Sequence, residues 1–273
     1  MDSVVAIPTI NNLNYLKKAV KSVRCSFPYE LLVLVNGSTD GTVEWLDEQK
    51  IPYIYHEKNL GCAYVNNEAM DYAFNQDKLL FIIHNDLILH KDCLDYMYKA
   101  MVENQEYDMV YAMETVSAQA NPEVMKEFYW KFTYDGDNKG LDTENDVEYT
   151  GVFPERGVNF TARAIKKTIV DKVGYFDVSY FPTYFDDNDY GLRCVLGDVK
   201  FGIVPSACFY HFWSRSIHEG GLGEINSRRF EINRRFYINK WGGTIGNETI
   251  LEPNIKLMRT REEDYNIVKQ WVI

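Results

Sequence analysis

The chain has 273 residues, of which 46% are hydrophobic and 25% charged, enough apolar material for one large α/β domain or for such a domain with a small appendage. Its formal net charge of −11 disfavours non-specific binding to nucleic acid or to an anionic membrane, and a phosphate-bearing ligand would need an accompanying cation. The five cysteines form no C-x-x-C pair, which argues against a zinc site and a disulfide framework.

The hydropathy pattern predicts no integral membrane segment. No stretch reaches the roughly 18–20 uncharged apolar residues that span a bilayer. Residues 1–8 lack a basic lead and a long apolar core, so they predict a first β-strand and not a signal peptide. We therefore expect a cytoplasmic location.

The first part of the chain alternates between short apolar runs and amphipathic segments. The expected strands cover residues 4–7, 31–35, 53–55 and 79–83. The expected helices, in which apolar residues recur every three or four positions, cover residues 13–23, 42–50 and 63–74. This alternation predicts βαβ units and a mainly parallel, Rossmann-like sheet flanked by helices.

The second part of the chain is less regular. The expected strands cover residues 109–112 and 201–204, and the second of them ends before Pro205. The expected helices cover residues 123–132, 164–173 and 225–241. Residues 134–150 are acidic and contain glycines, which predicts a surface loop.

Polar side chains follow three of the expected parallel strands. They are Pro8, Thr9 and Asn11 after the first strand, residues 36–40 after the second, and His84, Asn85 and Asp86 after the strand at 79–83. Because ligands bind beyond the carboxyl ends of parallel strands, these clusters predict a binding site at one edge of the sheet. The alternative for Ser38, Thr39 and Asp40 is that one of them only caps the following helix.

A second acidic cluster contains Asp186, Asp187 and Asp189. Three carboxylates this close repel one another unless a cation, Arg193 or a proton relieves them. Such crowding can raise the pKa of one carboxyl into the range of a general base. The alternative is an acidic helix start without a catalytic role.

Several of these motifs resemble blocks of glycosyltransferase family 2. The matching segments are residues 36–42 (N-G-S-T-D-G-T), 59–61 (N-L-G) with 66–69, 79–86, and 91–94, and they occur in the family's order and spacing. Residues 186–193 resemble its E-D-x-D-L-x-x-R motif, and the resemblance extends from residue 4 to residue 241.

The resemblance implies a GT-A type α/β fold with a smaller mixed region on the acceptor side. It implies a nucleotide-sugar-binding half at residues 1–112 and an acceptor and catalytic half at residues 113–243 of the same domain. Residues 244–273 would form a C-terminal extension.

The resemblance also implies residues that hold the nucleotide-diphosphate sugar. These are Pro8, Thr9, Asn11, Asn36, Asp40, Gly61, Asn66, His84 and Asn85. Asn36, Thr9 and Asp40 would hold the nucleoside end.

A divalent metal ion, Mn²⁺ or Mg²⁺, is implied by the family's D-x-D motif, which reads His84-Asn85-Asp86 here. Asp86 keeps the position that contacts the metal, whereas His84 replaces the first acid. An imidazole suits manganese better than magnesium and supplies no negative charge. His211 matches a further family ligand, although a histidine among aromatic residues can also be purely structural.

The resemblance implies an inverting glycosyltransferase in which Asp187 is the general base for an acceptor hydroxyl. The alternative is a non-catalytic nucleotide-sugar-binding protein with a degenerate metal motif. A nucleotidyltransferase would need a glycine-rich basic loop near the N-terminus, and residues 8–11 are not one. A glycan, a protein and a modified nucleic-acid base all stay open as the acceptor, as does the oligomeric state.

Overall fold

The computed structural model describes residues 2–114, 146–154, 160–212, 223–251 and 255–271. The helix expected at 123–132 and most of the acidic loop expected at 134–150 lie outside these ranges, and residues 146–150 carry no helix or strand. Among the described residues, no helix combines the length and the apolar character that crossing a membrane requires.

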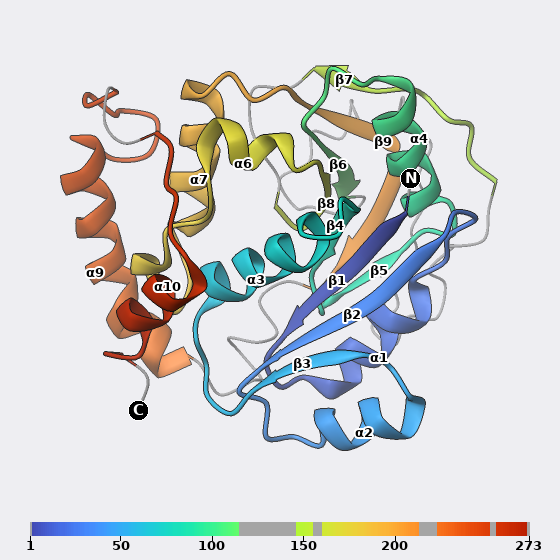
Figure 1. The fold of residues 1–273 in the computed structure, drawn as a ribbon, viewed down its shortest axis with the longest axis horizontal. Helices are drawn as coiled ribbons and strands as arrows, with labels where there is room; N and C mark the ends of the chain where they lie inside the picture. The colour runs from blue at the N-terminus through green and yellow to red at the C-terminus, as the bar shows by residue number, and fades with distance from the viewer. Residues whose placement is uncertain (1, 115–145, 155–159, 213–222, 252–254, 272–273) are drawn as a thin grey trace.

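The described strands form one nine-stranded sheet in the order β3-β2-β1-β4-β8-β6-β9-β5, with β7 paired to β9 (Figure 1). Their bounds are β1 Ser3–Thr9, β2 Tyr29–Asn36, β3 Tyr53–His56, β4 Leu79–Ile83, β5 Leu87–Leu89, β6 Met109–Glu114, β7 Phe153–Pro154, β8 Ala162–Ile165 and β9 Phe201–His211. Strands β3, β2, β1 and β4 are parallel, as the alternating pattern predicts, whereas β8 and β5 run antiparallel to their neighbours.

Helices cover both faces of the sheet. Their bounds are α1 Leu13–Ser22, α2 Thr42–Gln49, α3 Cys62–Phe74, α4 Cys93–Glu103, α6 Thr168–Val173, α7 Asp186–Leu196, α9 Gly223–Trp241 and α10 Arg261–Val268, with a 3₁₀ turn, η1, at Val178–Tyr180. Alternate residues of each strand point to opposite faces. In β1, Val4 belongs to the core on the side of α3, α6 and α7, and Val5 belongs to the core on the side of α1 and α4.

Two expected elements of the second half are wrong in their bounds. The helix expected at 164–173 is instead strand β8 followed by the short helix α6, because residues 162–165 pair with both β4 and β6 and this pairing overrides the helical preference of alanine. The strand expected to end before Pro205 continues to His211. The register between β6 and β9 shifts from Ala112↔Val204 to Met113↔Cys208, so Pro205 lies in a bulge where its missing N–H costs no ladder hydrogen bond.

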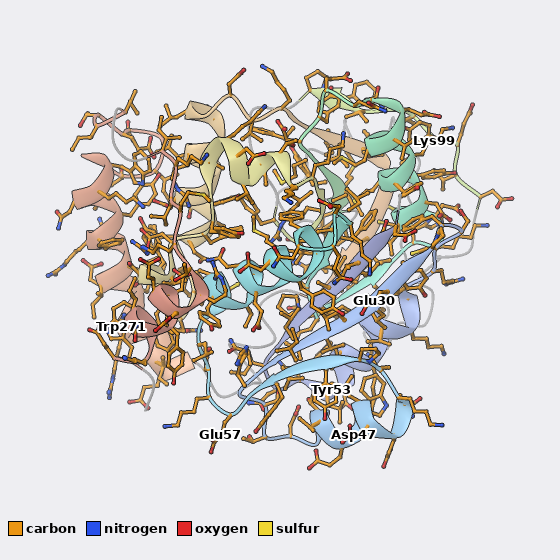
Figure 2. The ribbon with its side chains drawn as sticks, viewed as in Figure 1. Glu30, Asp47, Tyr53, Glu57, Lys99 and Trp271 are labelled. Carbon is orange, nitrogen blue, oxygen red and sulfur yellow. The ribbon has the colours of Figure 1, made fainter. Side chains whose placement is uncertain are left out.

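Charged side chains cover the outside of the molecule. Figure 2 shows Glu57 and Lys99 at the edge of the molecule, whereas the half-buried Glu30 accepts a hydrogen bond of 3.0 Å from Lys78 Nζ. Asp47 accepts a hydrogen bond of 3.0 Å from the Tyr53 hydroxyl, which ties α2 to β3.

The segment after α9 is tied back to the main domain at Gly174. The N–H of Leu257 donates to the Val173 carbonyl at 3.0 Å, and the N–H of Tyr175 donates to the Leu257 carbonyl at 2.8 Å. Gly174 has φ +73°, and a Cβ at this position would overlap the carbonyl group of Leu257. Glycine is therefore required both for the backbone angle and for the close approach.

Gly174→Ala should lower the free energy of unfolding more than Gly151→Ala. Both positions have positive φ, but a Cβ at Gly151 meets no atom of the described residues within 4 Å. We expect a loss of about 1 kcal/mol at Gly151 from the backbone angle alone, and a further loss of about 1–3 kcal/mol at Gly174 from the overlap. Urea denaturation of both variants measures this difference, and equal losses would contradict the role given to the Leu257 contact.

Candidate active site

Hydrogen bonds between loops fix the carboxyl ends of the parallel strands. After β4, the Asn85 side-chain amide donates to the Thr9 hydroxyl at the end of β1 over 2.8 Å. At the end of β2, the Asn36 side chain accepts from the Leu60 N–H at 2.8 Å and donates to the Asn59 side-chain oxygen at 3.0 Å. The strand ends therefore present Thr9, Asn36 and Asn85 from one fixed edge of the sheet.

His84, Asp86 and His211 form a cluster of potential metal ligands at the same edge. Antiparallel pairing of β5 with β9 places His211 opposite Leu87, so its imidazole lies beside Asp86. The distance from His211 Nε2 to Asp86 Oδ1 is 3.0 Å. Ligand atoms of the three residues lie within 4.8 Å of one another, and Glu114 Oε2 lies 3.9 Å from His211 Nδ1 on the other side of the ring.

His84 is neutral at physiological pH. Burial, and then the neighbouring His211 and Arg163, lower the pKa of its imidazole to about 3, although Asp86 opposes the shift. A neutral imidazole keeps a lone pair for a cation. Two imidazole nitrogens and a carboxylate are a donor set that fits a divalent transition metal.

The three acids of the second cluster lie in three different environments. Asp189 is completely buried and has a structural role. Its carboxylate binds Arg193 Nε at 2.9 Å, Trp241 Nε1 at 2.9 Å and Lys240 Nζ at 2.6 Å. Its charge is therefore compensated within the core.

Asp186 and Asp187 begin helix α7 and both line a cavity. Burial, and then the charge of Asp187, raise the pKa of the Asp186 carboxyl to about 8, so Asp186 is mostly protonated at neutral pH. Asp187 is accessible to solvent, yet the surrounding protein limits its hydration and raises the pKa of its carboxyl, against hydrogen bonds that include one from the Asn188 N–H.

Arg163 is the buried cation opposite this pair. Its guanidinium has no exposed surface and donates to the Asn66 side-chain oxygen at 3.0 Å. Burial lowers the pKa of Arg163 to about 10, while Asp186 and Asp187 are among the groups that oppose this shift, so the guanidinium stays charged at neutral pH.

The backbone just before α7 is strained. Tyr184 and Phe185 have φ of +73° and +69°, which costs a residue with a side chain roughly 1–2 kcal/mol. The buried amide of Asn233 on α9 lies 2.9 Å from the Thr183 carbonyl and 3.0 Å from the Tyr180 carbonyl. This amide holds the strained segment, and with it the direction in which Asp187 points.

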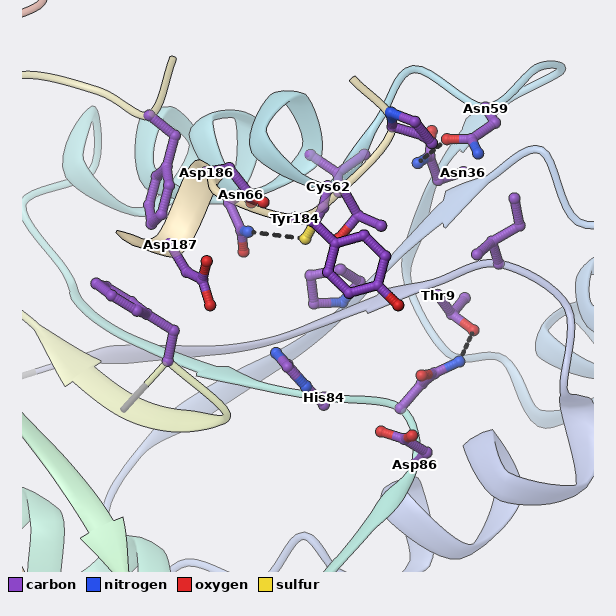
Figure 3. Close-up of a pocket in the computed structure, with 18 of the residues that line it drawn as sticks. Thr9, Asn36, Asn59, Cys62, Asn66, His84, Asp86, Tyr184, Asp186 and Asp187 are labelled. Atoms are coloured by element: carbon purple, nitrogen blue, oxygen red, sulfur yellow. Dashed lines mark hydrogen bonds between the residues drawn. The ribbon is translucent and has the colours of Figure 1, made fainter. Parts of the chain in front are cut away.

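One cavity of about 370 Å³ brings the two acidic motifs together. Of the residues expected from the sequence, its lining includes Pro8, Thr9, Asn36, Asn66, His84, Asn85, Asp86, Asp187 and His211. Figure 3 shows Asp187 on one side of the cavity, His84 and Asp86 on another, and Thr9 and Asn36 beyond the Tyr184 ring. Residues 101 positions apart in the sequence, Asp86 and Asp187, therefore share one site.

Three expected residues do not line this cavity. Asp40 accepts from the Leu13 N–H at 2.8 Å, and Asn11 accepts from the Thr39 N–H at 2.8 Å. These contacts connect the loops after β1 and β2 behind the cavity wall. Gly61 precedes α3, and a Cβ there would come within 3.1 Å of the Phe181 ring and 3.3 Å of the Pro182 carbonyl oxygen. Close packing against Phe181 and Pro182 explains why a glycine occupies this position.

Several lining residues were not predicted from the sequence. Arg163 lines the cavity, and nothing in the sequence indicates that its side chain is buried there. Tyr184 and Asn226 line the cavity without any sequence pattern that marks them. Only the strained backbone and the contact with α9 show that Tyr184 faces the site.

Solved structures with a similar fold include glycosyltransferases of the GT-A fold. S. aureus TarS 1-349 in complex with UDP is 14% identical, with a TM-score of 0.55 over 90% of this chain and 74% of that one. PcManGT, a mannosyltransferase from Pyrobaculum calidifontis in complex with GDP-Man and Mn²⁺, is 13% identical, with a TM-score of 0.57 over 98% and 73%. GalNAc-T7 with UDP, GalNAc and Mn²⁺ is 13% identical, with a TM-score of 0.58 over 77% and 44%. The α/β, GT-A fold expected from the sequence is confirmed.

The chain belongs to glycosyl transferase family 2, whose family model matches residues 4–160. The prediction that it is a glycosyltransferase is confirmed by this match. No curated protein matches the sequence. The matched region contains His84 and Asp86, whereas Asp187 and His211 lie beyond it.

Asp186→Asn should make the protein more resistant to alkaline pH. The pKa of Asp186 is raised in the fold, to about 8, so the fold favours its protonated form. Its contribution to stability is complete below the unfolded pKa of about 3.9 and is lost as the pH rises through about 8. Asparagine cannot ionise, so the melting temperature of the variant should exceed that of the wild type by a growing margin between about pH 5 and about pH 9.

Asp198→Asn is the matched control, because Asp198 is an exposed acid just after α7 whose side chain pairs only with Lys200 among the described residues. Scanning calorimetry over the pH series measures all three proteins. Parallel curves for wild type and Asp186→Asn would show that Asp186 does not titrate in this window.

Proposed function

We propose that this protein transfers a sugar from a nucleoside-diphosphate sugar to an acceptor hydroxyl with inversion, assisted by a divalent cation, with Asp187 as the general base. One observation carries this proposal: Asp187 lines the same cavity as the cluster of His84, Asp86 and His211. The cavity is of a size that suits a nucleotide-sized ligand, since ligand pockets measure roughly 300–1,000 Å³.

His84, Asp86 and His211 would hold the cation, which we propose is Mn²⁺. The ligand atoms already lie within 4.8 Å of one another, and Glu114 is placed to orient the His211 ring. PcManGT and GalNAc-T7 carry Mn²⁺ in the structures cited above. When bound, the cation supplies positive charge to the leaving diphosphate.

The charges of the cavity support a need for a cation. The lining carries the carboxyl groups of Asp86 and Asp187 beside the mostly protonated Asp186, and Arg163 is the one Lys or Arg among its described residues. His84 is neutral because its pKa is lowered to about 3. A diphosphate would meet a net negative lining, which disfavours its binding unless a divalent cation enters with it.

The residues at the strand ends would hold the donor. Thr9, Asn36 and Asn85 present hydroxyl and amide groups to the cavity from loops that cross-link one another. In this arrangement residues 1–112 bind the nucleotide sugar, and residues 113–243 carry the base and the acceptor side. Asn11 and Asp40 act indirectly, because they fix the loops that carry the binding groups.

Asp187 would take the proton of the attacking hydroxyl. It is exposed, accessible from the cavity and aimed by the segment that Asn233 holds. Its neighbour Asp186 is buried and mostly protonated, so Asp187 is the carboxyl group of the pair that is open to the cavity. The pair thus offers one base and no second free carboxylate that could act as a nucleophile. This favours one in-line displacement, which inverts the anomeric centre.

A non-catalytic nucleotide-sugar-binding protein is the competing proposal, since His84 interrupts the acidic motif. The cluster argues for catalysis, because the replaced acid has become a neutral nitrogen ligand within 4.8 Å of the ligand atoms of Asp86 and His211. Release of nucleoside diphosphate in the presence of Mn²⁺ separates the two proposals.

Asp187→Asn should abolish most turnover and leave donor binding intact. The donor is first identified by thermal shift with UDP-, GDP- and dTDP-sugars, each with and without Mn²⁺, since a bound donor stabilises the fold. Loss of the general base should lower kcat by at least about 100-fold, while the Kd of the donor changes by less than about threefold. Release of nucleoside diphosphate and calorimetric titration provide the two measurements.

Asp198→Asn again serves as control and should keep wild-type turnover. Wild-type turnover by Asp187→Asn would refute the assignment of the base. Loss of donor binding in that variant would instead place Asp187 in donor recognition.

His84→Asp should shift the metal preference from Mn²⁺ towards Mg²⁺. A carboxylate oxygen suits Mg²⁺, whereas an imidazole nitrogen favours the transition metal. We expect the ratio of kcat/KM with Mg²⁺ to that with Mn²⁺ to rise by about tenfold, equivalent to a preference change of about 1.4 kcal/mol. An unchanged ratio would show that His84 does not contact the cation. His56→Asp, a change outside the cavity lining, controls for the added acid.

A further inference from the structure

A second cavity, of about 260 Å³, adjoins the proposed donor site. Asp187 and Phe160 line both cavities, so the carboxylate of the proposed base lies on their shared wall. In a displacement reaction the base must contact the acceptor hydroxyl while the donor lies on the other side of that oxygen. The second cavity therefore has the position that an acceptor needs.

Helix α7 forms one wall of this second cavity. Asp187, Gly191 and Val195 all line it, and their spacing of four residues places them along one face of the helix. The cavity thus extends along α7 away from the base. Gly191 contributes no side chain, which leaves room beside the helix at its middle.

The opposite wall comes from the end of α9 and the segment after it. The Tyr237 hydroxyl donates to Glu248 Oε1 at 2.6 Å, and the Gly246 N–H donates to the same oxygen at 2.9 Å. Both of these hydrogen bonds are made to Oε1 of the Glu248 carboxylate. The N–H groups of Thr249 and Ile250 both bind the Trp241 carbonyl, so this segment is fixed to the helix.

The chemistry of the lining selects the class of acceptor. Glu248 and Asn188 offer acceptors and donors for hydroxyl groups, and the rings of Phe160 and Tyr237 offer faces for C–H groups. No Lys or Arg is among the described residues that line this cavity. A phosphate or a nucleic-acid strand is bound chiefly through such cations, and two carboxylates would repel it.

We propose that this second cavity is the acceptor site and that it binds a neutral sugar ring, with Glu248 binding ring hydroxyls. This inference rests on the proposed transferase function and names the acceptor class that the function leaves open. The acceptor oxygen forms a bond to the anomeric carbon of the donor as the bond from that carbon to the diphosphate oxygen breaks. The hydroxyl proton passes to the Asp187 carboxylate, and the electron pair leaves with the nucleoside diphosphate.

Two variants test the site. Gly191→Leu fills the cavity from the helix, and Glu248→Gln removes the charge that accepts the sugar hydroxyl. The controls are Asn239→Leu, an exposed helical position on α9, and Glu262→Gln, an exposed acid on α10. The probes are the methyl glycosides of glucose, galactose, mannose and N-acetylglucosamine, together with glycerol phosphate and a single-stranded oligonucleotide.

Binding is measured first by saturation-transfer NMR without any donor. We expect at least one methyl glycoside to receive saturation from the wild type and from both controls, and the signal to be lost with Gly191→Leu. Transfer is then measured with the donor found by thermal shift and with Mn²⁺. Both cavity variants should lower kcat/KM for the glycoside by about tenfold or more, while the Kd of the nucleoside diphosphate changes by less than about twofold.

The two levels of the proposal fail in distinguishable ways. Failure of every nucleotide sugar to bind would refute the transferase proposal, whatever the glycosides do. Donor binding with no glycoside bound or used, or use of glycerol phosphate or the oligonucleotide in preference to every glycoside, would overturn the acceptor assignment alone. Unchanged glycoside kinetics in both cavity variants would also overturn it. Melting temperatures of all four variants show that each is folded at the assay temperature.

Discussion

The site depends on one pairing, that of β5 with β9. Strand β5 has only three residues, yet its register with β9 sets His211 opposite Leu87 and therefore beside Asp86, 125 positions earlier in the chain. Strand β9 also pairs with β6. It therefore connects β5, which follows the acidic motif at Asp86, to the rest of the sheet. A slip of one residue would turn His211 to the opposite face and separate the cluster.

The acidic cluster at α7 illustrates how environment divides the roles of identical side chains. The carboxylate of Asp189 pairs with Arg193 and Lys240 inside the core. Asp186 is also buried, and burial together with the charge of Asp187 outweighs the opposing effect of Arg163, so its raised pKa leaves it mostly protonated. Asp187 is exposed to the cavity. The ion pairs of Asp189 and the proton on Asp186 reduce the repulsion that three adjacent carboxylates would otherwise exert.

The sequence predicted what depends on local pattern and missed what depends on distant contacts. The parallel strands and their helices up to Ile83 were predicted well because periodicity and polar strand ends are local signals. Strand β8 was missed because its pairing partners decide its conformation, and the course of β9 past Pro205 depends on a bulge against β6. Asp86 and Asp187 were found through motifs, whereas Tyr184 required the strain before α7 and the Asn233 amide that lies far along the chain.

Different parts of the chain form the proposed donor side and the proposed acceptor side. The family match covers residues 4–160, which supply the strand ends and the acidic motif at Asp86. The second cavity is built mainly from α7, the end of α9 and residues 245–248, all beyond that match. Likeness to the family therefore informs the donor side more than the acceptor side. In the proposed reaction Asp187 stands between the two cavities, so the acceptor can change through residues such as Glu248 while the proposed donor loops and the proposed base stay in place.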